Sequence, residues 1–126
     1  MDEVTAANRK FEKELKSGTA ALLLLGILAG EDRPMYGYEI TGLLDRAADS
    51  APDGVPRFKQ GALYPVLRSM ERSGILESAV EPSVSGPPRK YYSLTGTGRA
   101  VLVEWSGRWE ATRELVDSIL KGREDE

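Results

Sequence analysis

The chain has 126 residues, of which 40% are hydrophobic and 29% charged, and this balance predicts one globular domain with a core plus an accessory element. It contains no cysteine and no histidine, so disulfides and thiolate metal sites are excluded, and the commonest general base and metal ligand are missing. Because no pair of carboxylate, lysine or tyrosine side chains is marked out by its spacing, the sequence predicts neither an enzyme nor a cofactor or metal site.

The apolar segments are too short for a membrane. The longest run, residues 20–29, is about half of the roughly 20 residues that a membrane-spanning helix needs. The first 16 residues are rich in charge and lack the apolar stretch of a signal peptide. We therefore expect a cytoplasmic protein with no membrane partner.

The net charge of −3 conceals a basic segment. Residues 31–54 carry two cations and six anions, whereas residues 55–100 carry seven cations and three anions. Cations concentrated in this way either meet phosphate or form an ordinary solvated surface, and charge alone leaves both interpretations open.

The N-terminal part of the chain predicts two helices. Apolar residues recur at helical spacing among the charges of residues 1–17, which predicts an amphipathic accessory helix. Ser17-Gly18 is expected to end that helix and Thr19 to cap the next one. Residues 22–28 are apolar on all sides, so this second helix belongs in the core.

Residues 35–48 predict a further core helix. Gly37 and Gly42 lie inside it, and each costs up to about 1 kcal/mol relative to alanine, which indicates close approach of neighbouring elements. Residues 50–56 (SAPDGVP) are turn-forming throughout and predict a loop before the next helix, which Gly74 ends.

That next helix has two faces. Its inward stripe is Leu63, Val66, Leu67 and Met70. Tyr64, Arg68 and Arg72 follow one another at intervals of four and form an outward stripe, aromatic and then cationic. A short helix with such a face, leading into a strand, is expected of an element that lies in a DNA groove. For Arg72 a second interpretation stands, as a solvated cation paired with Glu71 or Glu77.

Physical chemistry assigns roles to residues on this face and just before it. Lys59 and Gln60 stand at the helix N-terminus, where free backbone N–H groups favour phosphate. The hydroxyl of Tyr64 can reach a phosphate or a base edge. The guanidinium of Arg68 can read guanine through its fork of donors.

Two β-capable segments, residues 75–81 and 89–94, flank a proline-rich tip and predict a hairpin. Arg89 and Lys90 stand at its root. Alternation along the strand sends them to opposite faces, so one of the two is expected to touch phosphate. By the same alternation, Tyr92 shares the face of Lys90.

Thr95 is expected to cap a long last helix whose apolar residues are spaced alternately by three and four. The residues expected at a dimer interface are Leu102, Trp105, Trp109, Val116 and Ile119. A second copy of the chain is the expected partner, in a two-fold homodimer. The alternative is that this helix packs back on its own domain.

The order helix, helix, helix, strand, loop, strand, helix describes a mainly α winged helix-turn-helix fold with a two-stranded β-wing. We expect the winged helix-turn-helix domain over residues 18–95. It would lie between the N-terminal accessory helix of residues 1–17 and a C-terminal dimerisation helix and tail of residues 96–126.

Several motifs resemble the PadR family of bacterial transcriptional regulators. They are YGYEI at residues 36–40, GALYP at residues 61–65 followed by Glu71 and Gly74-Ile75, and RKYYSLT at residues 89–95 between Gly86 and Gly98. The resemblance covers roughly residues 22–102, and the single long helix after the wing resembles the short-chain subgroup, in which it builds the dimer. The resemblance implies a homodimer that represses or activates transcription on a palindromic double-stranded DNA operator, often relieved by a small aromatic ligand.

Three positions depart from the family pattern. Pro87 and Ser93 stand where the family often has a cation, and Lys59 stands where it usually has a small capping residue. A missing cap costs about 0.5–2 kcal/mol, and each missing cation removes a phosphate contact. A modest DNA affinity or an unusual operator is therefore expected.

Trp105 and Trp109 have two interpretations. Large aromatic residues on a dimer seam are most often simply core. Alternatively, Trp105 of each subunit faces its mate and leaves a slot for a planar aromatic effector, with Glu104 and Arg108 supplying polarity. The resemblance implies this second role, because small PadR-like regulators that bind several drugs have a tryptophan at the corresponding helix position.

The predicted function is sequence-specific DNA binding by a transcriptional regulator, a repressor released from its operator by a small aromatic ligand. The alternative is a winged-helix module for protein–protein assembly without specific DNA binding. The two differ in their response to salt, since phosphate neutralisation makes affinity fall steeply with ionic strength.

Overall fold

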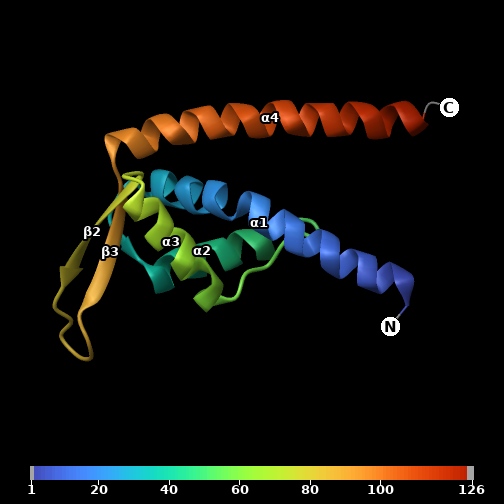
Figure 1. Ribbon diagram of the computed structural model, residues 1–126. Helices are drawn as coiled ribbons and strands as arrows, with labels where there is room; N and C mark the ends of the chain where they lie inside the picture. Colours follow the sequence, from blue (N-terminus) through green and yellow to red (C-terminus); the bar gives the residue numbers. More distant parts are fainter. Residues whose placement is uncertain (1, 125–126) are drawn as a thin grey trace.

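Four helices and a small antiparallel sheet form the fold. The computed structural model describes residues 2–124. Its elements are α1 (Glu3–Glu31), β1 (Met35–Tyr36), α2 (Gly37–Asp49), α3 (Gln60–Arg72), β2 (Leu76–Glu81), β3 (Arg89–Leu94) and α4 (Gly96–Glu124). The β2–β3 hairpin projects to one side as a wing, and α4 lies on the far side of α1 from α2 and α3 (Figure 1). The predicted winged helix-turn-helix fold is confirmed.

The first helix is longer than predicted. α1 continues through Ser17-Gly18 without a break, and the hydroxyl of Thr19 donates to the carbonyl of Leu15 at 2.7 Å instead of capping a new helix. The predicted end at Ser17-Gly18 is therefore wrong. A glycine inside a helix costs only about 1 kcal/mol, and burial of the leucines that follow outweighs it. α1 ends at Glu31, and its C-cap residue Asp32 has a left-handed φ of 51°.

The core is built around the second half of α1. The largest fully buried side chains are Leu24, Leu25, Met35, Ile40, Leu63, Leu67 and Leu76. They come from α1, α2, α3 and the first residues of β1 and β2. Burying each such side chain contributes about 1.5–3 kcal/mol, and together they hold α3 with its opposite face outward.

The helix predicted over residues 35–48 begins two residues later, because Met35 and Tyr36 form a strand; the predicted start is wrong. Met35 pairs with Tyr92 and Tyr36 with Tyr91, which gives a three-stranded sheet in the order β1-β3-β2. The backbone of Tyr36 is extended, and its N–H donates to Glu39 at 3.3 Å. Pairing with the wing strand thus outweighs the local helical pattern, and α2 begins at Gly37.

Of the two α2 glycines, Gly37 lies at a close approach and Gly42 does not. An added methyl group at position 37 would meet the ring of Tyr64, whereas one at position 42 would meet no atom within 4 Å. The prediction of close approach is confirmed for the first glycine and wrong for the second.

The remaining boundaries follow the prediction closely. Gly74, with φ of 78°, ends the turn after α3, and the wing strands pair from Leu76 with Leu94 to Glu81 with Arg89. The hydroxyl of Thr95 accepts a hydrogen bond of 2.9 Å from the N–H of Gly98, so Thr95 caps α4 as expected. None of the helices within residues 2–124 is long and apolar enough to cross a lipid bilayer.

Candidate nucleic-acid interface

The outer face of α3 is cationic and open to solvent. Leu63, Leu67 and Met70 are buried beneath it, as the inward stripe predicts. Arg68 and Arg72 are exposed, and neither forms an ion pair with a carboxylate within residues 2–124. The suggested pairing of Arg72 with Glu71 or Glu77 is therefore wrong, and both guanidinium groups keep their donors free.

The N-terminus of α3 adds to this cationic face. Lys59 is the N-cap, but its side chain makes no capping hydrogen bond, and no acidic residue stands in the first turn. Lys59 and Gln60 are both exposed. The N–H of Ala62 donates to the carbonyl of Lys59 at 3.0 Å. The N–H groups of Gln60 and Gly61 precede it at the positive end of the helix dipole, where an anion such as phosphate is favoured.

Tyr64 lies closer to α2 than the outward stripe predicts. Its side chain is half-buried, and a methyl group added to Gly37 would lie 2.5 Å from Cε1 and 2.7 Å from the hydroxyl oxygen. The ring therefore packs α3 against the first residue of α2. The hydroxyl lies at the N-terminus of α2, a second helix end that favours phosphate.

Lys90 lies in a polar cluster between the wing and α3. Its Nζ lies 2.7 Å from one carboxylate oxygen of Glu71, and the hydroxyl of Ser78 donates to the other. The hydrogen bond from Lys90, followed by that from Ser78, lowers the pKa of Glu71, and the same ion pair raises the pKa of Lys90. Lys90 also lies 5.3 Å from the ring centre of Tyr92, on the face that strand alternation predicts.

Arg89 lies on the opposite face, over an aromatic cluster. Its guanidinium carbon is 4.5 Å from the ring centre of Tyr36. The Tyr36 ring stacks on Tyr38 at 6.3 Å with an interplanar angle of 12°, and meets Tyr91 edge-on at 5.4 Å. Within residues 2–124, no carboxylate forms an ion pair with Arg89.

Sequence reasoning missed Tyr36, Tyr38 and Ser78 as parts of this surface. Arg89 and Tyr91 are two residues apart on one strand and therefore share a face, which is a signal for an aromatic neighbour of Arg89. Nothing in the local pattern indicated that Tyr36 pairs with this strand, because β1 is only two residues long. Together, the free guanidinium groups and helix N-termini form a surface suited to a polyanion.

The predicted dimer seam of α4 is divided into two parts. Leu102 and Trp105 are half-buried and pack against the core. Trp109 is 44% exposed, Val116 47% and Ile119 59%. The first part of the seam thus packs on its own domain, which was the alternative interpretation. The second part lies open to solvent.

Two apolar clefts border α1. The first, of about 510 Å³ between α1 and α4, is lined by Phe11, Leu15, Trp105, Trp109 and Arg108 among others. The second, of about 580 Å³, lies between α1, the end of α2 and the following loop, and it also reaches Trp109. Three of the four predicted ligand residues, Trp105, Trp109 and Arg108, therefore line one cleft. Glu104 does not line it, and instead pairs with Arg108 at 3.0 Å.

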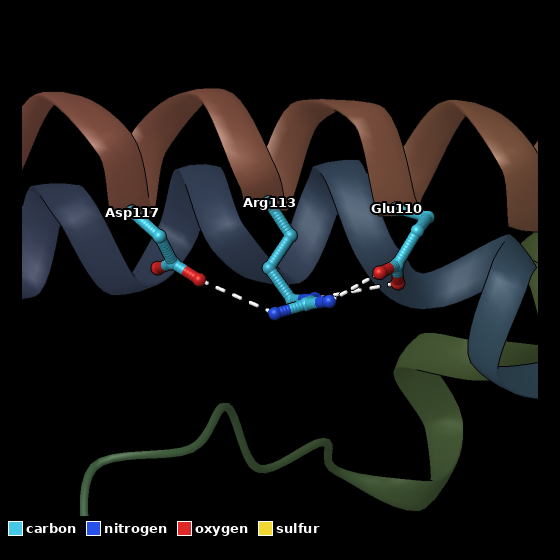
Figure 2. A network of polar contacts seen from close by, with 3 residues as sticks. All are labelled: Glu110, Arg113 and Asp117. Carbon is cyan, nitrogen blue, oxygen red and sulfur yellow. Dashed lines mark hydrogen bonds and ion pairs between the residues drawn. The ribbon is translucent and has the colours of Figure 1, made fainter.

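Ion pairs within α4 border the open seam. Figure 2 shows Arg113 between Glu110 and Asp117, to which it donates, the latter at 3.2 Å. The pKa of Arg113 is raised, and its hydrogen bond to Glu110 is the main cause. Because an α-helix has 3.6 residues per turn, the Arg113 network lies on one side of the seam residues of α4, and the Glu104–Arg108 pair lies on the other side. The seam is thus an apolar strip between charges that are already neutralised within the helix.

Comparison with known proteins agrees with this geometry. Residues 24–104 match the PadR-like family of transcriptional regulators. A PadR family regulator from Eggerthella lenta is 32% identical, and its crystal structure matches with a TM-score of 0.72 over 95% of this chain and 94% of that one. For a PadR-like regulator from Bacillus cereus the identity is 26% and the TM-score 0.66, over 85% and 96% of the two chains. An uncharacterized protein from Lysinibacillus sphaericus is 28% identical over 102 residues, 81% of this chain and 88% of its own. The chain belongs to the PadR-like family, whose members are DNA-binding transcriptional regulators and not enzymes.

Proposed function

We propose that this protein is a repressor that binds an inverted-repeat DNA operator as a homodimer and acts in the cytoplasm, on the chromosome. The observation that carries the proposal is the outer face of α3, where Arg68 and Arg72 are exposed and unpaired within residues 2–124. An arginine with free donors can bind the O6 and N7 atoms of guanine in a bidentate manner. Two such helices, about 34–36 Å apart in a dimer, would enter successive major grooves.

Residues around α3 would hold it in register on the backbone. Lys59 and Gln60 lie at its N-terminus and Tyr64 lies against the N-terminus of α2, so these side chains surround N–H groups that favour phosphate. One cation at the root of the wing adds a flanking contact. Such contacts fix orientation, while Arg68 supplies sequence discrimination.

The apolar surface of α1 and α4 supports pairing with a second copy. Beyond Trp109, α4 leaves its own core and exposes Leu115, Val116, Ile119 and Leu120. Exposed apolar surface of this extent, next to an apolar cleft of about 580 Å³, is typical of an interface. We assign this cleft to the distal half of the partner subunit's α4.

A planar aromatic effector fits the other cleft, between α1 and α4. Both tryptophans of the chain line it, so a ligand bound there would change the tryptophan fluorescence. A ring inserted beside Trp105 would change the angle of α4 and hence the spacing of the two α3 helices. We expect planar aromatic dyes to quench the fluorescence and Trp105→Ala to abolish that binding. Quenching unaffected by the substitution would exclude this site.

Selection of DNA from a random pool with the purified protein tests the central proposal. An inverted repeat with half-sites about one helical turn apart is expected. On that DNA, Arg68→Ala should weaken binding by about 1–3 kcal/mol, and less on unrelated duplexes. Arg99→Ala is the matched control, because this arginine lies near the start of α4, away from the open seam, and is already paired with Asp32. Recovery of no common sequence, with affinity independent of salt, would instead favour a protein–protein assembly module.

A further inference from the structure

The two cations at the root of the wing differ in their surroundings. Lys90 is closed into a cluster with Glu71 and Ser78, whereas the guanidinium of Arg89 lies over the ring of Tyr36. Glu81 stands directly opposite Arg89 on β2 but does not pair with it. The side chain of Arg89 instead lies over Tyr36 of β1, the strand on the other side of β3 from β2.

We propose that Arg89 is the cation of the wing that contacts phosphate, that Tyr36 is its positioning residue, and that Lys90 braces the wing without touching DNA. This inference rests on the proposed function, since it assigns one contact of the same interface. The alternation of side chains along the strand predicts only that one of Arg89 and Lys90 faces the DNA, without saying which.

The surroundings of Tyr36 explain how it would position Arg89. A guanidinium over an aromatic face is held by electrostatic attraction while its N–H donors remain free at the edge. The Tyr36 ring is itself fixed by stacking on Tyr38 and by strand pairing with Tyr91. Tyr36 directly precedes α2, whose first residue contacts Tyr64 of α3. The position of Arg89 is therefore tied to the helix that reads the major groove.

The cluster around Lys90 accounts for its different role. Glu71 lies in the last turn of α3, while Ser78 and Lys90 come from the two strands of the wing, so the cluster joins α3 to both strands. A lysine already neutralised by a carboxylate releases few counterions from DNA. Moving its ammonium to a phosphate would also leave Glu71 unpaired near the DNA backbone.

Salt dependence separates these roles. Binding to a labelled mixed-sequence duplex is measured between about 50 and 200 mM salt, where each neutralised phosphate contributes about 0.9 to the slope of log affinity against log salt. We expect Arg89→Met to lower the slope by about 0.9 per wing. The double variant Glu71→Lys/Lys90→Glu keeps the ion pair with its charges exchanged and should keep the wild-type slope. Thermal melting establishes that each variant is folded.

A double-mutant cycle tests Tyr36. Tyr36→Leu should weaken binding severalfold in the wild type but have no further effect in the Arg89→Met background. Tyr36→Phe retains the ring and should bind like the wild type. Additive losses from Tyr36→Leu and Arg89→Met would overturn the positioning role.

The outcomes distinguish this inference from the proposed function. A wild-type protein that does not bind the duplex overturns both. A wild-type protein that binds with a steep salt slope, which Arg89→Met leaves unchanged or the charge exchange reduces, overturns the inference alone.

Discussion

At the scale of single residues, the contact between Gly37 and Tyr64 sets how closely α2 and α3 approach. A methyl group at position 37 would lie 2.5 Å from Cε1 of Tyr64 and 2.8 Å from Cζ. We expect Gly37→Ala to displace the ring and to lower the free energy of unfolding by about 1–3 kcal/mol, the usual cost of overpacking. Urea denaturation of the two proteins measures the difference.

Gly42→Ala is the matched control, because its added methyl group meets no atom within 4 Å. Removing this glycine from a helix interior should raise the free energy of unfolding by up to about 1 kcal/mol. The steric explanation also requires Gly37→Ala to cost less in a Tyr64→Leu background. A Gly37→Ala variant as stable as the wild type would contradict it.

The ion pair between Glu71 and Lys90 makes stability depend on pH. The pKa of Glu71 lies below its ordinary value of 4.5 in the folded chain, so the unfolded chain takes up this proton first as the pH falls. The contribution of Glu71 is present above about pH 4.5 and is lost as the pH falls through the folded-state pKa. Between about pH 5 and 3 we expect Glu71→Gln to lose stability less steeply than the wild type.

Urea denaturation at several pH values measures this slope. Glu77→Gln, which removes an exposed carboxylate on the same hairpin, is the control and should keep the wild-type slope. Lys90 has the opposite sign: its pKa lies above 10.5 when folded, so its contribution is present below that pH and is lost as the pH rises further. Identical acid slopes for Glu71→Gln and the wild type would rule out the linkage.

At the scale of elements, the first turn of α4 is fastened to the junction of α3 and β2. The hydroxyl of Thr95 lies 2.7 Å from the carbonyl oxygen of Gly74 and 3.0 Å from that of Ile75. Gly98 is buried, and a methyl group there would overlap the carbonyl oxygen of Ile75. Because that oxygen belongs to the backbone, it cannot rotate away as a side chain does.

We therefore expect Gly98→Ala to lower the free energy of unfolding by at least about 3 kcal/mol, the upper end of the overpacking range. Gly96→Ala is the control two residues away, where an added methyl group meets nothing within 4 Å. Thermal melting of both variants measures the effect. Similar melting temperatures for the two would show that α4 can shift off this junction at little cost.

The elements that sequence reasoning predicted correctly have local signals. α3 has helical spacing with a glycine after its end, the wing has two alternating segments around a proline-rich tip, and α4 has Thr95 as a cap. In each case the residues that specify the element lie within a few positions of it. The exposure of Arg68 followed in the same way from the inward stripe of its helix.

The sequence-based predictions were wrong where the conformation of a segment depends on residues far from it in the sequence. Met35 and Tyr36 become a strand only because β3 lies beside them. α1 passes through Ser17-Gly18 because the residues that follow are buried against other elements. The pairing of Lys90 with Glu71 depends on the angle between the hairpin and α3, which no local pattern specifies.

At the scale of the whole molecule, two open surfaces lie on different sides of the core. The cationic face belongs to α3 and the wing, while the apolar seam belongs to α4, on the far side of α1 (Figure 1). The proposed pairing through α4 would therefore leave α3 uncovered. The spacing of the seam residues was visible in the sequence, but its division into a packed and an open half depends on where α4 diverges from α1.

Val116→Glu tests whether the open half of the seam pairs two copies. Val116 is 47% exposed, and a carboxylate buried there between two apolar helices would be strongly unfavourable. We expect the wild type to sediment as a dimer at micromolar concentration and Val116→Glu as a monomer. Ser118→Glu introduces the same charge on the opposite side of α4 and should remain dimeric, because that side carries no apolar strip.

The monomeric variant also gives a second test, on DNA. Since the proposed pairing would position the two α3 helices, this variant should lose most of its affinity for an inverted repeat while keeping its affinity for mixed-sequence DNA per chain. Dimers of unchanged stability in Val116→Glu would place the interface elsewhere on the molecule.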